Sequence, residues 1–520
     1  MRRPAQKCIA VLLLLALCLT LAGCWSDDPA AQGDELIDRI GGDTEDADNI
    51  VPITSFSLPV QAGETLDPIT CSDGVQQTLL PLLYEGLFEL DESFTPQNVL
   101  CSDYTHSEDY TVWTFTLRSG VTFSDGTALT AEDAAASLQR ARSSARYGAR
   151  LSAVTSVRAE NGAVVVTLSR GNNRLPALLD IPIVSRATAG DTAPAGTGPY
   201  RYDAGDGAPR LVKNETWWKG EAVPVDEIPL QQVDEDHTLS YLFSSHEIQM
   251  LVTDYTGASP VSYKGSISVT DAATTTMQFL GFRCTDGPFA DAALRRAVSE
   301  GIHRESICKA YFSGHADPAQ FPVSPLSPWY PAAAERAYSA DSFAQAMEEA
   351  GYRTGTRTVH VEMLVCDGNS SRLSAAKAIA AALSIYDLKV TVKTLPYAEY
   401  TAALQSGSFD LYYGEVRMTP DFDCTALVGT GGSLNYGGFS DPALDAQITT
   451  AFTTVSAPSS ANETMLSTLQ SAAPIAVICF KSQSVVVQGG AVDEITPTCF
   501  NPFYQLSNWE IHIKGEATNG

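Results

Sequence analysis

Side chains that could hold a charged ligand gather between Gly414 and Asp423, after an expected strand. Arg417 supplies a guanidinium group that can meet a carboxylate with paired hydrogen bonds. Asp421 and Asp423 supply acceptors for an ammonium group, so together with Arg417 they indicate a zwitterionic ligand. The same residues also fit a structural role, in which Asp421 caps the loop and Arg417 forms a surface ion pair.

The chain carries none of the short motifs that mark common catalytic centres. It has no Gly-x-Ser-x-Gly, His-Glu-x-x-His, Walker or Cys-x-x-Cys motif, and its closest histidines, His237 and His246, do not have a common metal-binding spacing. The segment from Gly196 to Gly198 lacks the third glycine of a phosphate loop, and Pro199 has no N–H to offer. We therefore expect no enzyme, no resident metal and no other cofactor, although a triad assembled in space would leave no such signature.

The clearest structural signal lies in residues 112–142. Apolar side chains recur at every second position from Trp113 to Phe115 and beyond, which predicts a half-buried strand. Turn residues follow, and Thr130 with Asp133 three positions later predicts a capped helix. This block is a scaffold, because its apolar residues are suited to a core.

Strands and helices then alternate in the second half of the chain, which predicts an α/β fold with a largely parallel sheet. The expected elements are strand 359–365, helix 371–385, strand 388–393, helix 397–405 and strand 409–413. Two further strands are expected at 474–480 and 484–488.

The N-terminus has the features of a secretory signal peptide over residues 1–23. Basic residues precede an apolar run that is too short for a comfortable membrane span of about 20 residues. The sequence Leu21-Ala22-Gly23-Cys24 resembles a bacterial lipobox, which implies a lipid on Cys24; an ordinary signal with an incidental cysteine is the alternative. Residues 24–50 are acidic and poor in apolar side chains, so we expect an extended tether.

Composition restricts the partners of the chain. Among its 520 residues, 33 are Lys or Arg and 61 are Asp or Glu, and the formal charge of −28 argues against nucleic acid and anionic membrane surfaces as partners. Eight cysteines follow Cys24, and their pairing cannot be read from the sequence. Cys308 and Cys479 lie in apolar runs and are expected to be buried.

Several motifs occur in the order found in one family of receptors. They are Leu66-Asp67-Pro68, Leu83-Tyr84-Glu85-Gly86-Leu87, the block 112–142, Gly196-Thr197-Gly198-Pro199-Tyr200, Asn214-Glu215-Thr216-Trp217-Trp218-Lys219-Gly220 and Leu294-Arg295-Arg296-Ala297. Over roughly residues 55–515 the chain resembles the oligopeptide-binding proteins of ABC importers, extracellular solute-binding protein family 5.

The resemblance implies a two-lobed α/β fold of the periplasmic-binding-protein type (cluster C), with an extra small domain in the first lobe. The implied lobe I core comprises residues 51–75, 190–280 and 481–520, the accessory domain comprises 76–189, and lobe II comprises 281–480. Such proteins close two lobes around a ligand.

The implied function is that of a monomeric receptor, anchored by lipid at the outer face of the cytoplasmic membrane, in the periplasm or at the cell surface. It would capture a small solute, a peptide first of all, and deliver it to ABC permease and ATPase subunits. Two alternatives keep the fold: a non-peptide ligand, such as an oligosaccharide, metal chelate, opine or haem, or a sensory receptor without transport.

The resemblance also implies where the ligand lies. Peptide-binding members hold the ligand amine with the Asp of a Gly-Trp-x-x-Asp segment, whereas this chain lacks the Trp and has Asp421 or Asp423 as replacements for the Asp. Further residues expected at the cleft are Ser72, Asp73 and Gly74 after the entry motif, Tyr147, Tyr413 in preference to Tyr412, and Asn435 with Tyr436 beside a glycine-rich loop.

Overall fold

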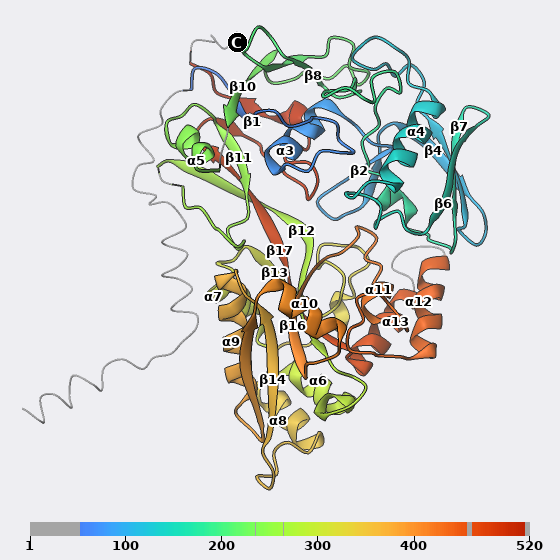
Figure 1. Ribbon diagram of the computed structural model, residues 1–520. Helices are drawn as coiled ribbons and strands as arrows, with labels where there is room; N and C mark the ends of the chain where they lie inside the picture. The colour runs from blue at the N-terminus through green and yellow to red at the C-terminus, as the bar shows by residue number, and fades with distance from the viewer. Residues whose placement is uncertain (1–52, 234–235, 264, 455–459, 515–520) are drawn as a thin grey trace, which may run out of the picture.

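The computed structural model describes residues 53–233, 236–263, 265–454 and 460–514. The signal peptide, Cys24 and the acidic tether therefore lie outside the described residues. Figure 1 shows two lobes, joined by the long strands β12 (Ile267–Phe282) and β17 (Ile475–Gln488). In the described ranges, no helix combines the length and the apolar character needed to cross a bilayer.

The core of lobe I is a four-stranded sheet in the order β1-β10-β9-β8. Its strands are β1 (Leu58–Gln61), β10 (Glu227–Val233), β9 (Arg210–Lys213) and β8 (Tyr200–Asp203). Helix α3 (Gly74–Leu83) packs its leucines, Leu79 and Leu80 among them, into the same core, and Pro81 lies near the end of this helix. We therefore propose that the accessory domain begins after α3 and not at residue 76.

The accessory domain is built on a four-stranded antiparallel sheet, β4-β5-β7-β6, covered by helix α4 (Ala131–Arg142). Trp113 and Phe115 are buried on β5, and Thr130 forms a capping box with Asp133, which confirms the strand and the helix start predicted for this block. The strands are β4 (Cys101–His106), β5 (Val112–Leu117), β6 (Val154–Glu160) and β7 (Ala163–Leu168), with the hairpin β2 (Phe88–Leu90) and β3 (Pro96–Asn98) beside them.

The largest sheet has the order β11-β17-β12-β16-β14-β15, with β13 (Ala316–Pro318) attached to β17. The remaining strands are β11 (Met250–Thr253), β14 (Val359–Cys366), β15 (Leu388–Leu395) and β16 (Leu411–Arg417). The three strands predicted from the alternating pattern, β14, β15 and β16, pair in parallel as expected. The other described pairings of this sheet are antiparallel, so the sheet as a whole is mixed and not largely parallel. The long strands β12 and β17 run antiparallel to each other, because β12 leads the chain from lobe I into lobe II and β17 leads it back.

The two strands expected at 474–480 and 484–488 form one strand, β17. The polar residues Ser482 and Gln483 between them pair with Ala273 and Ala272 of β12, so the ladder continues through the predicted gap. A local register shift, and not a break in the strand, absorbs the irregularity.

Helices cover both faces of this sheet in lobe II (Figure 1). They are α6 (Ala292–Glu300), α7 (Arg304–Tyr311), α8 (Ala340–Glu349), α9 (Ser370–Leu383), α10 (Tyr397–Gln405), α11 (Thr425–Val428), α12 (Pro442–Thr453) and α13 (Ser460–Ala472), while α5 (Asp236–Ser244) lies in lobe I. The eight cysteines of the described ranges are unpaired, and Cys308 and Cys479 are buried as expected.

Candidate functional site

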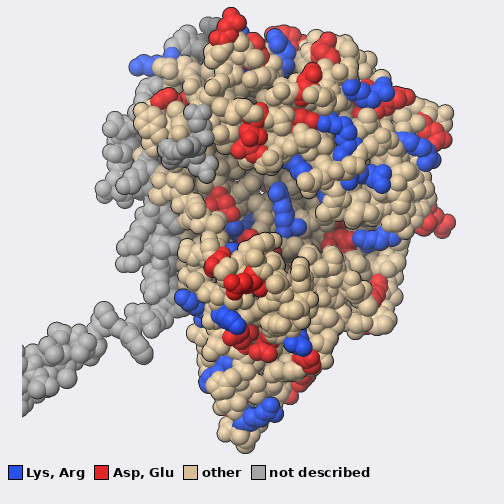
Figure 2. Space-filling view, viewed as in Figure 1, with Lys and Arg blue, Asp and Glu red and all other residues tan. Residues whose placement is uncertain are grey.

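A cavity of about 1230 Å³ lies where the two lobes and the accessory domain meet. Its walls come from the start of α3, the segment after α4, the end of β16 and the C-terminal segment around Phe500. Figure 2 shows the hollow between the lobes, with Lys and Arg side chains on its wall. The volume exceeds the range of about 300–1,000 Å³ that is usual for small-molecule sites, so a solute of several residues fits.

Five of the predicted ligand residues line this cavity: Ser72, Asp73, Gly74, Tyr147 and Arg417. The first three stand at the N-terminus of α3, where Asp73 Oδ1 accepts a hydrogen bond of 2.9 Å from Gln76 N. Because this carboxylate caps the helix, Asp73 has a structural task as well as its place at the cavity. Arg417 reaches the cavity because it is the last residue of β16.

Tyr413 does not line the cavity, which corrects the expectation that it faces the cleft. Only 1% of Tyr413 is exposed, and its side chain belongs to the lobe II core. Tyr412, which points to the other face of β16, is also buried. Strand β16 lies inside the sheet with helices over both faces, so neither side chain of the pair reaches the solvent.

Asn435 and Tyr436 also lie away from the cavity lining. The Asn435 side chain donates to the carbonyl oxygens of Gly429 and Phe439 and accepts from Phe439 N at 3.0 Å, so it holds its own loop together. Tyr436 packs edge-on against Tyr412 at 6.2 Å between ring centroids. The expectation that these two residues contact the ligand is therefore wrong, because both side chains have partners within lobe II.

Asp421 and Asp423 face the accessory domain and not the cavity. Asp421 Oδ2 accepts a hydrogen bond of 2.8 Å from Asn172 Nδ2, and Asp423 forms an ion pair with Arg170. The acidic half of the predicted zwitterion site is therefore occupied by partners within the protein. Arg417 lines the cavity as predicted, whereas Asp421 and Asp423 do not.

Arg174 completes this junction between the accessory domain and lobe II. Its guanidinium lies 3.8 Å from the ring centroid of Trp329 and 4.4 Å from that of Phe452, and it donates to Asp421 O at 3.0 Å and Asn462 Oδ1 at 2.7 Å. Burial lowers the pKa of Arg174 to about 10, which still leaves it charged at neutral pH. We call the following residues the interlobe contact: Arg170, Asn172, Arg174, Asp421, Asp423 and Asn462.

The pKa values of the two aspartates in the interlobe contact are shifted in opposite directions. Burial, together with the charge of Asp423, raises the pKa of Asp421. Burial also acts to raise the pKa of Asp423, but the charge of Arg170 and hydrogen bonds from Thr425 outweigh it, so this pKa lies below its usual value. Because its pKa is lowered, Asp423 is ionised at neutral pH.

Three residues that the sequence reasoning missed stand beside Tyr147 and Arg417 at the cavity: Arg146, Arg150 and Phe500. Arg150 forms an ion pair with Asp180, and its guanidinium lies 5.5 Å from the Phe500 ring centroid. Burial raises the pKa of the Tyr147 hydroxyl, and the charges of Arg146, Arg150 and Arg417 act against that rise. The only signal in the sequence was a pair of arginines four positions apart around Tyr147.

Acidic side chains on the lobe I wall of the cavity already have hydrogen-bond or ion-pair partners within the protein. Glu85 accepts hydrogen bonds from Trp218 Nε1 at 2.6 Å and Thr197 Oγ1 at 2.9 Å, with Lys219 Nζ at 3.6 Å. Burial raises the pKa of Glu85, although these partners oppose the shift. Glu89 accepts from Asn501 Nδ2. These carboxylates therefore support the wall and are not free to hold a cationic ligand.

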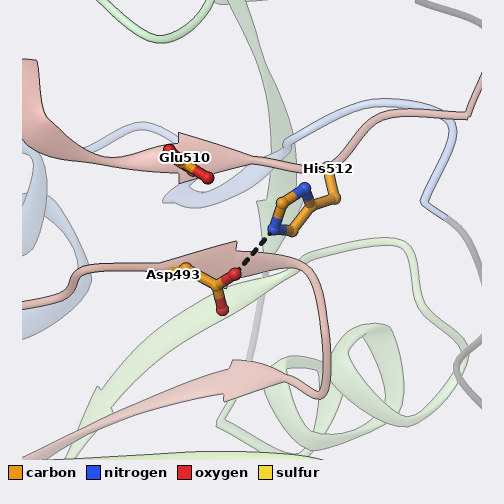
Figure 3. Close-up of side chains that lie close together, drawn as sticks. All are labelled: Asp493, Glu510 and His512. Atoms are coloured by element: carbon orange, nitrogen blue, oxygen red, sulfur yellow. Dashed lines mark hydrogen bonds and ion pairs between the residues drawn. The ribbon is translucent and has the colours of Figure 1, made fainter. Parts of the chain in front are cut away.

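A separate cluster of Asp493, Glu510 and His512 lies on the two-stranded antiparallel sheet of β18 (Val492–Asp493) and β19 (Glu510–Ile511), with His512 directly after β19. Figure 3 shows His512 pointing to Asp493, and the His512 Nε2 to Asp493 Oδ2 distance is 2.8 Å. All three side chains are exposed, and hydrated surface carboxylates commonly sit beside a histidine without a metal. We attach no function to this cluster.

Comparison with known proteins identifies the family. The profile of the bacterial extracellular solute-binding proteins, family 5, matches residues 95–434. The chain belongs to this family. Its architecture, two α/β lobes with an accessory domain in the first, is the one that the motif order implied.

Named proteins are similar to this chain in sequence or in fold. The glutathione-binding protein GsiB of Escherichia coli K12 is 26% identical over 311 residues, which are 56% of this chain and 60% of GsiB. The unliganded open form of the murein tripeptide-binding protein MppA has a TM-score of 0.72 at 17% identity, covering 89% of this chain and 98% of MppA. A nickel ABC transporter protein of Bacillus halodurans has a TM-score of 0.73 at 20% identity, covering 87% and 98%. These structures share the fold.

Proposed function

We propose that the chain is the solute-binding receptor of an ABC importer and that it captures a small, peptide-like solute in the cavity between its lobes. The observation that carries this proposal is the cavity itself, which is lined by lobe I, the accessory domain and lobe II together. A solute that contacts all three favours the closed arrangement of the lobes over the open one. The closed surface is then what a permease would recognise.

The family consists of solute-binding proteins and not of enzymes. We therefore propose capture and release without chemical conversion of the solute.

A peptide-like solute is favoured by the named relatives, since GsiB binds glutathione and MppA binds a murein tripeptide. A metal chelate is the second candidate, because the Bacillus halodurans neighbour belongs to a nickel transporter.

We further propose that Cys24 carries lipid and holds the receptor at the outer face of the cytoplasmic membrane. The basic start, the apolar run and the sequence Leu-Ala-Gly before Cys24 support this proposal. Stable anchoring takes more than one acyl chain, which a lipobox lipid supplies. Replacing Cys24→Ser should move the protein from the membrane fraction to the soluble fraction; retention in the membrane would contradict the anchor.

The capture proposal is tested by mass spectrometry of the full chain under native and denaturing conditions. A native mass excess that disappears on denaturation identifies a bound solute, and its mass separates a peptide from a metal chelate. Absence of any excess, combined with no rise in melting temperature across peptides and chelates, would overturn the proposal.

A further inference from the structure

Four cationic side chains line the cavity, and they divide into two kinds. Arg150 pairs with Asp180, and Lys219 lies beside Glu85. Arg146 and Arg417 have no carboxylate within ion-pair distance among the residues that the structure describes. Two cations that face one cavity without counter-charges give its wall a positive charge, which favours an anionic ligand.

The two arginines come from opposite sides of the cleft. Arg146 follows α4 in the accessory domain, and its guanidinium lies 5.2 Å from the Tyr147 ring centroid. Arg417 ends β16 in lobe II, and its guanidinium lies 5.9 Å from the Phe500 ring centroid. Arg146 also donates a long hydrogen bond of 3.4 Å to Cys71 O. A guanidinium group has five N–H donors, so both arginines keep donors for a ligand beside these contacts.

The acidic side chains of the cavity do not neutralise this pair, because each has another partner or lies elsewhere. Asp73 caps α3, Glu89 accepts from Asn501, and Asp254 pairs with Lys481 at 2.7 Å. Glu85 and Asp180 hold the other two cations, and Glu221 is an exposed residue close in sequence to Lys219.

We propose that the solute carries a carboxylate group that is held between Arg146 and Arg417. This inference rests on the proposed receptor function and narrows its ligand class to acidic solutes, either peptides with a free C-terminus or acidic side chain, or chelates built from carboxylic acids. An arginine can bind a carboxylate through two parallel hydrogen bonds. Because one arginine belongs to each side of the cleft, the carboxylate also links the lobes in their closed arrangement.

The test compares acids with neutral counterparts of nearly the same size, using the full chain in mild detergent. The probes are glutathione, trialanine and citrate, against glutathione diethyl ester, trialanine amide and trimethyl citrate. Affinity is measured by titration calorimetry and by the rise in melting temperature. We expect at least one acid to bind at least tenfold more tightly than its neutral counterpart.

The variants Arg146→Gln and Arg417→Gln connect the preference to these residues. Each should weaken the acid at least tenfold and leave the neutral counterpart unchanged, while Arg146→Lys and Arg417→Lys should retain part of the affinity. Arg357→Gln is the matched control, because Arg357 is exposed and lies outside the cavity lining. Circular dichroism and melting of the unliganded variants show that each one folds.

The outcomes separate the two proposals. Neutral counterparts that bind as tightly as the acids, or glutamine variants with unchanged acid affinity, overturn the carboxylate inference and leave the receptor function standing. If none of the probes binds, the co-purified solute decides: a solute without a carboxylate, or one that Arg146→Gln still retains, overturns the inference. No bound probe and no co-purified solute would overturn both proposals.

Discussion

The arginines of the interlobe contact and those of the cavity join the same two parts of the molecule but have opposite surroundings. Arg170 and Arg174 find a carboxylate, a carbonyl oxygen, an amide oxygen and aromatic rings in lobe II. Arg146 and Arg417 contact aromatic rings, and no carboxylate of the described ranges forms an ion pair with them. Arg174 is buried and therefore needs partners within the fold, whereas Arg146 and Arg417 are exposed at the cavity and are available to a ligand.

The interlobe contact and the pair Arg146 and Arg417 therefore have different roles. The interlobe contact is made within the chain and needs no ligand, so it holds the accessory domain against lobe II. The pair in the cavity gains its counter-charge only from a solute. Ligand-dependent closure is therefore expected to change the distance between Arg146 and Arg417 more than the interlobe contact.

Removing Arg174 should have the largest effect. Arg174→Ala deletes two buried hydrogen bonds and the contacts with Trp329 and Phe452, so we expect a loss of about 2–5 kcal/mol in the free energy of unfolding. Urea denaturation measures it, with Arg357→Gln as the control. A loss below about 1 kcal/mol would mean that the interlobe contact is not a stabilising junction.

Asp423 gives a smaller, pH-dependent effect. Its pKa is lowered in the folded protein, so the stability it contributes is present above its unfolded value of about 4 and is lost as the pH falls through the lower folded value. Asp423→Asn should therefore cost about 1 kcal/mol at pH 7, and the difference from the unmodified protein should shrink below pH 4.

Urea denaturation between pH 3 and pH 7 checks this prediction, with Asp226→Asn as the control because Asp226 is an exposed carboxylate in a long surface ion pair. A difference that stays constant over this range would show that the Asp423 charge does not carry the effect. A difference that grows at low pH would reverse the assigned sign.

The smallest effect on stability is expected at the cavity. Arg146→Gln and Arg417→Gln remove exposed cations without carboxylate partners, so the melting temperature of the unliganded protein should stay the same or rise slightly. Differential scanning calorimetry at low and high salt measures this change. A clear drop would show that these arginines serve the fold, and the contrast with Arg174 would disappear.

Much of the scaffold could be predicted from local sequence. The strand around Trp113 and Phe115 and the cap at Thr130 were predicted because the side chains that determine them lie within a few positions of one another. Helix α10 lies where the pattern placed it, at residues 397–405. The sheet order was harder, because Ser482 and Gln483 read as a break although their partners on β12 continue the strand.

Some residues of the candidate site could likewise be predicted from the sequence, and others could not. Ser72, Asp73, Gly74, Tyr147 and Arg417 were placed at the cavity by motif order and segment position. Asp421 and Asp423 have the right chemistry for a ligand, but nothing in the sequence shows that the accessory domain already supplies their partners. Arg146 was missed because its meaning depends on the absence of a nearby carboxylate, which is a property of three-dimensional packing.

Local sequence was sufficient to predict many of the helices and strands, the resemblance to the family and the net acidic charge, because periodicity, caps and composition act over short stretches of chain. Which charged side chains have partners within the protein, and which do not, depends on the tertiary structure. Arg170 and Asp423 lie 253 positions apart, and Asn172 and Asp421 lie 249 apart. Only folding brings such residues within a few ångströms, the range over which charge pairing is strong.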